Sequence, residues 1–420
     1  MRPSPALFRE MHNSLSPSSE AHLNHAIARI VEAKERCGKV VVVTGSGPNL
    51  HEGVTTQIAE LIDKRLVDGV ITSSAVIAHE MAGTLDRVKR IPVTTDRDLP
   101  LPAAFLPRGR IFEITKLTPE QRTELERELP DGWDFYDEMN RRPGSVVIKA
   151  AGNMAWPMGL RTERIAREIR GLASQFGVSL ELLAGLGASP MTMIGAGARK
   201  NVPVLVSIPQ LVGGGAVGLA IGDTISLARR AREIAAMLAS ADVIIESAIA
   251  LSQEIHDGPF ETYTGHGIWA AWDHIPTYSL QGKTLIRIDL DTNLELAWNR
   301  ERSNAEVQNA VNQGLPKTKR TGIPFRMEMS GFARLESSIP VTGDIGSVWP
   351  LIAQALEEKL HTKLDFISAP QESEYGKEMR SWIADDIRYL DRSEMYRLAE
   401  QRFSRHAPTA SLENVPVERP

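Results

Sequence analysis

Residues 40–83 read VVVVTGSGPNLHEGVTTQIAELIDKRLVDGVITSSAVIAHEMAG, and this stretch decides the fold. Val40–Val43 has the β-branched richness of a strand that is buried on both faces. Val54–Arg65 places its apolar residues on one stripe, which predicts an amphipathic helix. Val67–Ile71 predicts a second strand. The stretch is therefore expected to form a βαβ unit with two parallel strands.

Polar and glycine residues follow both predicted strands. In a parallel sheet, ligands bind in the crevice beyond the carboxyl ends of the strands, so this chain is expected to hold a small molecule, a nucleotide above all. Backbone N–H groups at a helix N-terminus would favour its phosphate. The alternative is a plain strand-to-helix turn, with Ser73 or Ser74 capping the next helix. The candidate cofactor contacts in this stretch are Thr44, Gly45, Ser46, Asn49, Gly53, Thr72, Ser73 and Ser74.

Composition excludes several classes of protein. The chain has 420 residues, 42% of them hydrophobic, enough for a large core in one big domain or two. A net charge of −5 gives no electrostatic case for nucleic-acid binding. The lone Cys37 excludes an internal disulfide. The N-terminal residues lack the apolar core of a signal peptide, and no apolar run is long enough to span a membrane. We therefore expect a cytoplasmic protein without a membrane partner.

The remaining pattern alternates strands and helices. Residues 1–20 are rich in Pro and Ser and predict an arm, and Ile91–Gly109 predicts an irregular excursion because it carries four prolines. From about Glu372 a charged helical segment leads into a disordered tail. Further strands are predicted at Ser145–Ala150, Leu182–Ala188, Val202–Ile208, Ala241–Glu246 and Thr284–Leu290. Further helices are predicted at Thr118–Leu129, Arg161–Phe176, Ala216–Ser240 and in the second part of Val341–Leu360.

The order of four blocks resembles the deoxyhypusine synthase family. The first block is the 40–83 stretch, with Pro48-Asn49-Leu50 and His79-Glu80. The second is Lys200–Val204 with the glycine-rich loop through Gly218. The third is Thr264-Gly265-His266-Gly267-Ile268, and the last is Val341-Thr342-Gly343-Asp344 followed by Val348–Ile352. Together the blocks span roughly residues 35–360 in the same order as in the family.

This resemblance implies an α/β fold with a Rossmann-type parallel sheet flanked by helices and extended by helices at both ends. The expected division is an N-terminal arm and helix over 1–34, an NAD-binding α/β domain over 35–365, and a C-terminal helical extension with its tail over 366–420. Family members use NAD to transfer an aminobutyl group from spermidine to a protein lysine. They form homo-oligomers, so we expect a dimer or tetramer with active sites at subunit interfaces.

The chain departs from the family at its nucleophile. Family members form an imine on a lysine within a Trp-Gly-Lys motif, and here the counterpart is Glu328–Leu335, with Arg334 in the position of the lysine. A guanidinium stays protonated and cannot act as an amine nucleophile. Leu219 stands where an acidic residue would hold a polyamine. These changes indicate an anionic or zwitterionic substrate, which Arg334 would bind as a fixed cation.

The candidate catalytic residues are His266, His79, Arg334 and Glu328. A neutral imidazole suits a general base, although any single histidine is more often a loop or core residue. Further candidate cofactor contacts are Gly265, Gly267, Asp344 and Ser347. The Asp344 carboxylate could accept hydrogen bonds from a ribose or cap a helix. Lys149 is a candidate replacement amine or an ion-paired lysine, and Trp269 and Trp272 are candidates for stacking or interface packing.

Two functions of different classes remain open. The first is an NAD-dependent oxidoreductase or transferase that acts on a small substrate other than spermidine. The second is a catalytically inactive nucleotide-binding or oligomeric scaffold of the same fold. The histidines and Glu52, Glu80 and Glu246 match no metal-ligand spacing, so no metal is expected.

Arg334 generates a first prediction. Incubation of the protein with spermidine, NAD and the lysine-bearing acceptor protein should give no aminobutylated lysine by mass spectrometry, because a guanidinium forms no imine. An authentic deoxyhypusine synthase under the same conditions is the positive control. Transfer by this chain would show that another amine, such as Lys149, serves as the nucleophile.

Overall fold

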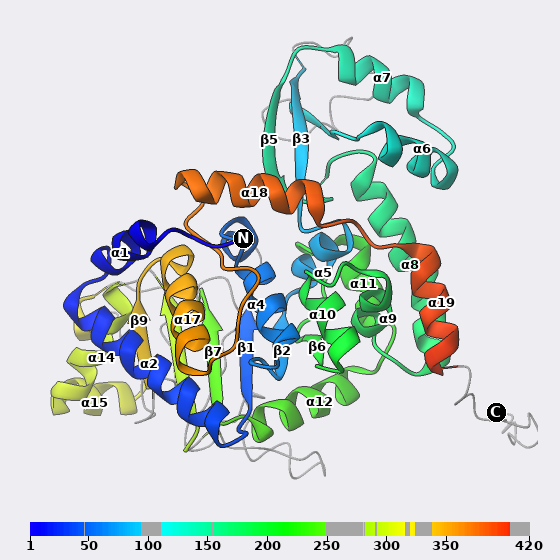
Figure 1. The fold of residues 1–420 in the computed structure, drawn as a ribbon. Coiled ribbons are helices and arrows are strands. Elements are labelled where there is room, and N and C mark those ends of the chain that lie inside the picture. The colour runs from blue at the N-terminus through cyan, green and yellow to red at the C-terminus, as the bar shows by residue number, and fades with distance from the viewer. Residues whose placement is uncertain are drawn as a thin grey trace, which may run out of the picture.

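The architecture is that of a computed structural model. It describes residues 1–45, 47–93, 111–152, 154–248, 280, 282–289, 292–315, 320–323 and 338–403. Its centre is a six-stranded parallel sheet with the spatial order β6-β2-β1-β7-β8-β9 (Figure 1). The strands are β1 (Val40–Thr44), β2 (Gly69–Thr72), β6 (Val204–Val206), β7 (Val243–Ser247), β8 (Thr284–Asp289) and β9 (Ser338–Thr342). This confirms the predicted α/β class and its Rossmann-type parallel sheet.

Both faces of this sheet are covered by helices, as the unbroken apolar strands require. Val40 and Val42 of β1 face a large core, which α2, α4, α10 and α17 help to build. Val41 and Val43 face the opposite side, where α12 packs. The helices in the first part of the chain are α1 (Pro5–Asn13), α2 (Pro17–Glu35), α3 (Pro48–His51), α4 (Val54–Asp63), α5 (Ser74–Met81), α6 (Pro119–Glu128) and α7 (Trp133–Arg141). Those that follow are α8 (Met158–Phe176), α9 (Leu180–Gly187), α10 (Met193–Lys200), α11 (Gly215–Gly222), α12 (Leu227–Ser240), α14 (Thr292–Ser303), α15 (Ala305–Asn312), α17 (Ile345–Lys359), α18 (Glu374–Asp386) and α19 (Arg392–Phe403).

A second sheet is inserted between α5 and α8. Its three antiparallel strands have the order β4-β3-β5, with β3 at Leu85–Pro92, β4 at Ile111–Thr115 and β5 at Ser145–Ala150. Strand β3 was not predicted, because its sequence is rich in charged residues. These charges are accommodated in the folded chain by partners: Arg87 forms two 2.7 Å hydrogen bonds with Asp385 of α18. Helix α18 thereby lies against the small sheet (Figure 1). The excursion predicted over Ile91–Gly109 lies mostly outside the described residues.

The strand predicted at Leu182–Ala188 is wrong, because Leu182–Gly187 belong to helix α9 and Ala188 is its C-cap. Ser179 caps the helix and accepts a hydrogen bond from the Leu182 amide at 3.2 Å. Its two glycines allow close packing, since a Cβ on Gly185 would lie 2.3 Å from the Ile194 carbonyl. A helix that is buried on every side gives the same continuous apolar run as a buried strand, so periodicity could not separate them.

The single helix predicted over Ala216–Ser240 is two helices, α11 and α12. The break falls before Ser226, whose hydroxyl caps α12 by accepting a hydrogen bond from the Arg229 amide at 3.2 Å. At the N-terminus, Phe8 and Met11 of α1 are buried in the main core. The division of the chain at residues 34 and 365 stays a prediction.

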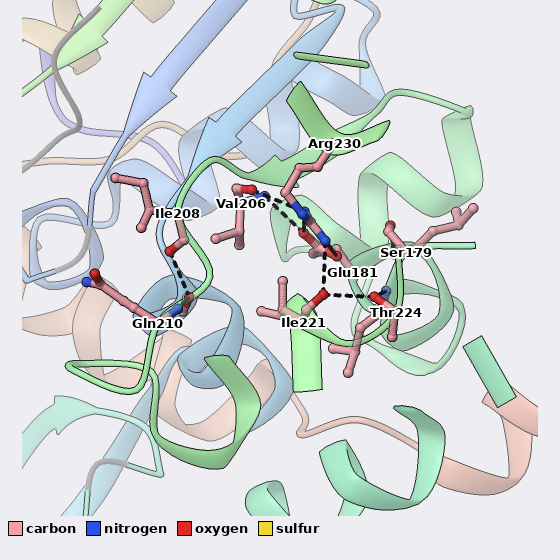
Figure 2. Close-up of polar contacts among 11 residues, drawn as sticks. Ser179, Glu181, Val206, Ile208, Gln210, Ile221, Thr224 and Arg230 are labelled. Atoms are coloured by element: carbon pink, nitrogen blue, oxygen red, sulfur yellow. Dashed lines mark hydrogen bonds and ion pairs between the residues drawn. The ribbon is translucent and has the colours of Figure 1, made fainter. Parts of the chain in front are cut away.

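A buried ion pair connects α9, which packs on one face of the sheet, with α12, which packs on the other (Figure 2). Arg230 of α12 and Glu181 of α9 have almost fully buried side chains and approach to 2.5 Å. Arg230 also donates to the carbonyls of Val206 and Ile221 at 3.1 Å each, and Glu181 accepts from the Val206 amide at 2.9 Å. One charge pair therefore fixes α9, α11 and α12 against the end of β6.

Arg230→Leu should lower the free energy of unfolding by about 3–5 kcal/mol, because it leaves the Glu181 carboxylate buried without its counter-ion. Arg229→Leu on the same helix is the matched control. Its exposed pair with Glu233 should contribute less than about 1 kcal/mol. Urea denaturation followed by circular dichroism measures both variants, and equal losses would contradict the importance of the buried pair.

Candidate functional site

The strand order reverses between β1 and β7. From β1 the chain proceeds outward through β2 and β6, whereas from β7 it proceeds in the other direction through β8 and β9. Numbered along the chain, the sheet has the order 3-2-1-4-5-6 that dinucleotide-binding folds use. Ligands of such sheets bind where the order reverses, beyond the carboxyl ends of the two central strands. Here those ends are Thr44 of β1 and Ser247 of β7.

A buried chain of hydrogen bonds lies at this edge. The Ser247 hydroxyl donates to Oδ1 of Asn49 at 2.6 Å and accepts from the indole Nε1 of Trp349 at 2.8 Å. All three side chains are buried. They come from β7, from the short helix α3 after β1, and from α17, so this contact sets the positions of three elements around the crevice.

Two polar atoms at the same edge have no hydrogen-bond partner in the described part of the chain. They are the hydroxyl Oγ1 of Thr44 and the amide Nδ2 of Asn49, both fully buried. A buried polar group without a partner costs about 1–3 kcal/mol, so a ligand that pairs with it recovers that free energy. The arrangement fits a ligand with hydrogen-bonding groups at this position.

The three consecutive hydroxyls that begin at the last residue of β2 all have protein partners. Thr72 donates to the Thr44 carbonyl at 2.9 Å and so links the ends of β1 and β2. Ser73 caps α5, accepting from the Val76 amide at 3.4 Å, as its capping alternative predicted. Ser74 donates to the Ile208 carbonyl at 3.4 Å and accepts from the Gln210 amide at 3.3 Å. These hydroxyls hold the loops, and a ligand contact by any of them stays a prediction.

The other predicted cofactor contacts near β1 have different surroundings. Gly45 is buried directly after β1. Gly53 has a φ of +70° and precedes α4, and a Cβ there would lie 2.8 Å from Sδ of Met379. Both its backbone angle and its packing therefore require glycine. Ser46 lies outside the described residues.

Carboxylates gather at the start of α17. Asp344 occupies the N-cap position, and burial raises its pKa, with a further increase from the charge of Glu372. Burial also raises the pKa of Glu52 to about 7, although Gln371 donates two hydrogen bonds to it. A Cβ on Gly346 would lie 2.4 Å from Oε2 of Glu52. Ser347 is buried one residue further on. The Asp344 carboxylate can therefore accept a hydrogen bond close to the crevice.

The backbone at Ala150 and Ala151 lies beside two histidines. Nδ1 of His79 is 2.7 Å from the Ala151 carbonyl oxygen, which can only accept, so Nδ1 carries the proton. Burial lowers the pKa of His79, and its Nε2 is then an unprotonated acceptor near neutral pH. His51 accepts a hydrogen bond from the Ala150 amide at 3.2 Å through Nε2. Burial lowers the pKa of His51 to about 4, with smaller contributions from nearby cations.

His79 lines a cavity of about 570 Å³. The glycine loop Gly213–Gly215 forms part of its wall, and Trp156 and Glu163 lie on the side of β5 and α8. Glu163 accepts a hydrogen bond from the Ala216 amide at 3.2 Å, which fixes the loop to α8. The volume is in the range of small-molecule sites. Large exposed apolar side chains occur in the segments around this cavity: Met154, Leu160, Ile208, Leu211, Val212 and Leu219.

Three other candidate residues have structural partners. Glu80 is fully buried and accepts hydrogen bonds from the amides of Met193 and Ile194 at the start of α10, at 2.9 and 3.0 Å. Lys149 pairs with Glu113 at 2.8 Å, which is its ion-paired alternative. Glu246 pairs with Arg287 of the neighbouring strand at 2.8 Å. Among the described residues, no group of acidic, histidine and cysteine side chains could hold a metal ion.

Five further candidates lie outside the described residues: Gly265, His266, Gly267, Glu328 and Arg334. Trp269 and Trp272 lie outside them as well. Sequence reasoning missed Ser247 and Glu163. Ser247 had a signal, because it follows a predicted strand, whereas nothing in the sequence marks Glu163 as part of a cavity wall.

No family model and no curated protein matches the sequence. Solved structures share parts of the fold at low similarity. One is a protein named as LOR/SDH from Methanococcus maripaludis S2, 12% identical, with a TM-score of 0.38 over 82% of this chain and 69% of that one. AgrE in complex with ornithine and NAD⁺ is 15% identical, with a TM-score of 0.37 over 82% of this chain and 34% of that one.

A third structure is named as a deoxyhypusine synthase, from Entamoeba histolytica. It is 9% identical, with a TM-score of 0.33 over 81% of this chain and 88% of that one. AgrE is a longer protein, and this chain spans only about a third of its length. At TM-scores below 0.5 these matches identify neither a family nor an activity. No helix in the described ranges has the length and apolar character needed to cross a membrane.

Glu80 generates a prediction about pH. Burial raises its folded pKa from 4.5 to about 7, so between these values the folded state binds a proton that the unfolded state has lost. This contribution to stability is present at low pH and is lost as pH rises through 7. The glutamine of Glu80→Gln cannot titrate. The difference in the free energy of unfolding between the native protein and this variant should therefore become smaller from pH 4.5 to 7.

Glu163→Gln is the control, because that side chain is partly exposed. The pH dependence that tests the prediction is the one by which Glu80→Gln differs from this control. Denaturant unfolding at several pH values measures both variants. A gap for Glu80→Gln that is constant or widens with pH would contradict the raised pKa.

Proposed function

We propose that this protein is an NAD-dependent enzyme, an oxidoreductase or transferase, that acts on a small anionic or zwitterionic molecule. The observation that carries the proposal is the reversal of strand order at β1 and β7, with the unpartnered polar atoms of Thr44 and Asn49 at that point. A dinucleotide has the hydroxyl and phosphate oxygens that these groups would pair with.

The residues present fit a dinucleotide in the crevice. Thr44, Gly45 and Asn49 lie on the side of β1, and Asp344 and Ser347 lie at the start of α17. An acidic side chain is what a ribose hydroxyl needs as acceptor, which suits NAD. When bound, NAD would supply a hydride acceptor. The chain itself would bind, orient and desolvate the reactants.

His79 has the properties of the base that such a reaction needs. Removing a hydride from a carbon that carries a hydroxyl or amine also requires a group that accepts the proton from oxygen or nitrogen. The Ala151 carbonyl fixes the proton on Nδ1, which leaves Nε2 to accept. His79 lines the 570 Å³ cavity, which would hold the substrate. Leu219 near the glycine loop is exposed and uncharged, so it offers no carboxylate to a polycation. The Glu163 carboxylate in the cavity wall is held by the Ala216 amide.

The rival function is an inactive scaffold of the same fold. It gives no reason for the neutral His79 in a cavity or for unpartnered buried groups at the strand ends. We also propose a homo-oligomer, whose contacts would cover the exposed apolar side chains around that cavity. Native mass spectrometry of freshly purified protein would measure subunit number and any co-purified dinucleotide in one experiment.

Thr44→Val tests the crevice. The change removes a buried hydroxyl that has no partner, so the free protein should be as stable as before or slightly more stable. If NAD pairs with this hydroxyl, the free energy of NADH binding should become less favourable by about 1–3 kcal/mol, the scale of a lost buried hydrogen bond. Fluorescence titration with NADH measures the affinity, and thermal unfolding measures the stability.

Thr115→Val is the matched control. Thr115 is also buried with an unpartnered hydroxyl, but it lies in β4 of the small sheet. It should leave NADH affinity unchanged. Equal effects of the two substitutions would remove Thr44 from the site, and a native protein that binds neither NAD nor NADH would remove the dinucleotide.

A further inference from the structure

A second cavity lies at the opposite edge of the main sheet. Its volume is about 750 Å³. Its wall includes Lys39, Asp68 and Pro203, which precede β1, β2 and β6 respectively. It therefore opens at the amino ends of these strands, whereas the crevice described above lies at their carboxyl ends.

The wall combines apolar and cationic side chains. Leu182, Ile194, Val204 and Met237 are among its apolar members. Five cations line it: Lys39, Arg65, Lys200, Arg229 and Arg402. Three acidic residues line it as well: Asp68, Glu181 and Glu233.

Every acidic group in this wall is already paired. Asp68 accepts from Lys34 at 2.9 Å, Glu181 pairs with the buried Arg230, and Glu233 pairs with Arg229. Two further cations also have partners. Lys200 lies 2.9 Å from Asp63, and Arg402 donates to Oδ1 of Asn201.

Lys39 and Arg65 are different. In the described part of the chain, neither side chain makes a hydrogen bond or an ion pair. Both are exposed at the cavity, one before β1 and one after α4. The wall therefore carries two positive charges that pair with no side chain of the described residues, next to an apolar surface.

We propose that this cavity binds a small organic anion. Its carboxylate or phosphate would pair with Lys39 and Arg65, and its apolar body would lie against the surface that includes Met237 and Leu182. An inorganic anion would contact only the two cations, and the alkyl chain of an organic cation would contact only the apolar surface. The cavity should therefore discriminate between these three kinds of ligand.

The cavity wall is connected to the glycine loop Gly213–Gly215, which follows the carboxyl end of β6. Glu181 accepts from the Val206 amide and pairs with Arg230, which donates to the Val206 carbonyl (Figure 2). Val206 ends β6, and the chain continues from there into Gly213–Gly215. Ligand that orders this wall is expected to slow amide hydrogen exchange over residues 204–215.

Isothermal titration calorimetry with three probes tests the proposal: octanoate, octylamine and inorganic phosphate. The native protein should bind octanoate more tightly than either of the other probes. The double variant Lys39→Gln/Arg65→Gln should weaken octanoate binding at least about tenfold, the scale of two charge-assisted contacts. Ala236→Trp should also abolish it, because Ala236 lines the cavity and is exposed, so the indole fills space without entering the core.

Arg9→Gln/Arg388→Gln is the matched control, with the same loss of charge at two exposed cations outside the cavity. It should leave octanoate affinity unchanged. Equal weakening in both double variants, binding retained in Ala236→Trp, or octylamine binding as tightly as octanoate would each overturn the proposal. None of these measurements involves NAD, so they stand or fall separately from the proposed enzyme. Hydrogen exchange with and without octanoate then reports whether the ordering reaches residues 204–215.

Discussion

The hydrogen bonds of the Ser247 hydroxyl are the interaction on which the geometry of the crevice depends. This single buried group donates to Asn49 and accepts from Trp349. It thereby ties the loop after β1 and the N-terminal part of α17 to the end of β7. A parallel sheet by itself leaves the loops beyond its carboxyl ends free to diverge. Because this contact is buried, breaking it would leave polar atoms unpaired, which holds the elements in one arrangement.

Buried charge is compensated locally throughout the core. Glu181 with Arg230 and Glu246 with Arg287 form ion pairs whose members are almost fully buried. Glu80 instead accepts two backbone amides at the start of α10. The buried unpartnered atoms of Thr44 and Asn49 in the crevice are exceptions to this pattern. Exceptions of this kind are informative, because an unpaired polar group costs free energy that a ligand can recover.

Local sequence was sufficient for some elements. The helix predicted over Thr118–Leu129 is α6, and a capping box at Thr118 and Gln121 begins it, with both hydrogen bonds made within four residues. It was insufficient for Leu182–Ala188, where a helix buried on all sides resembles a buried strand. It also missed β3, because its charged residues have distant partners, such as Asp385, which pairs with Arg87 from almost 300 positions away.

The sequence alone determined the parallel βαβ core and the polar character of its strand ends, because both follow from side-chain periodicity and from residues that are neighbours in the chain. It placed Thr44 and Asn49 at the carboxyl-end edge of the sheet for the same reason. Only the tertiary structure decided that Ser247 meets Asn49, that His79 faces a cavity with a fixed tautomer, and that Lys39 and Arg65 share another. These contacts join residues up to 198 positions apart, and their pairing depends on strand order, which no local pattern encodes.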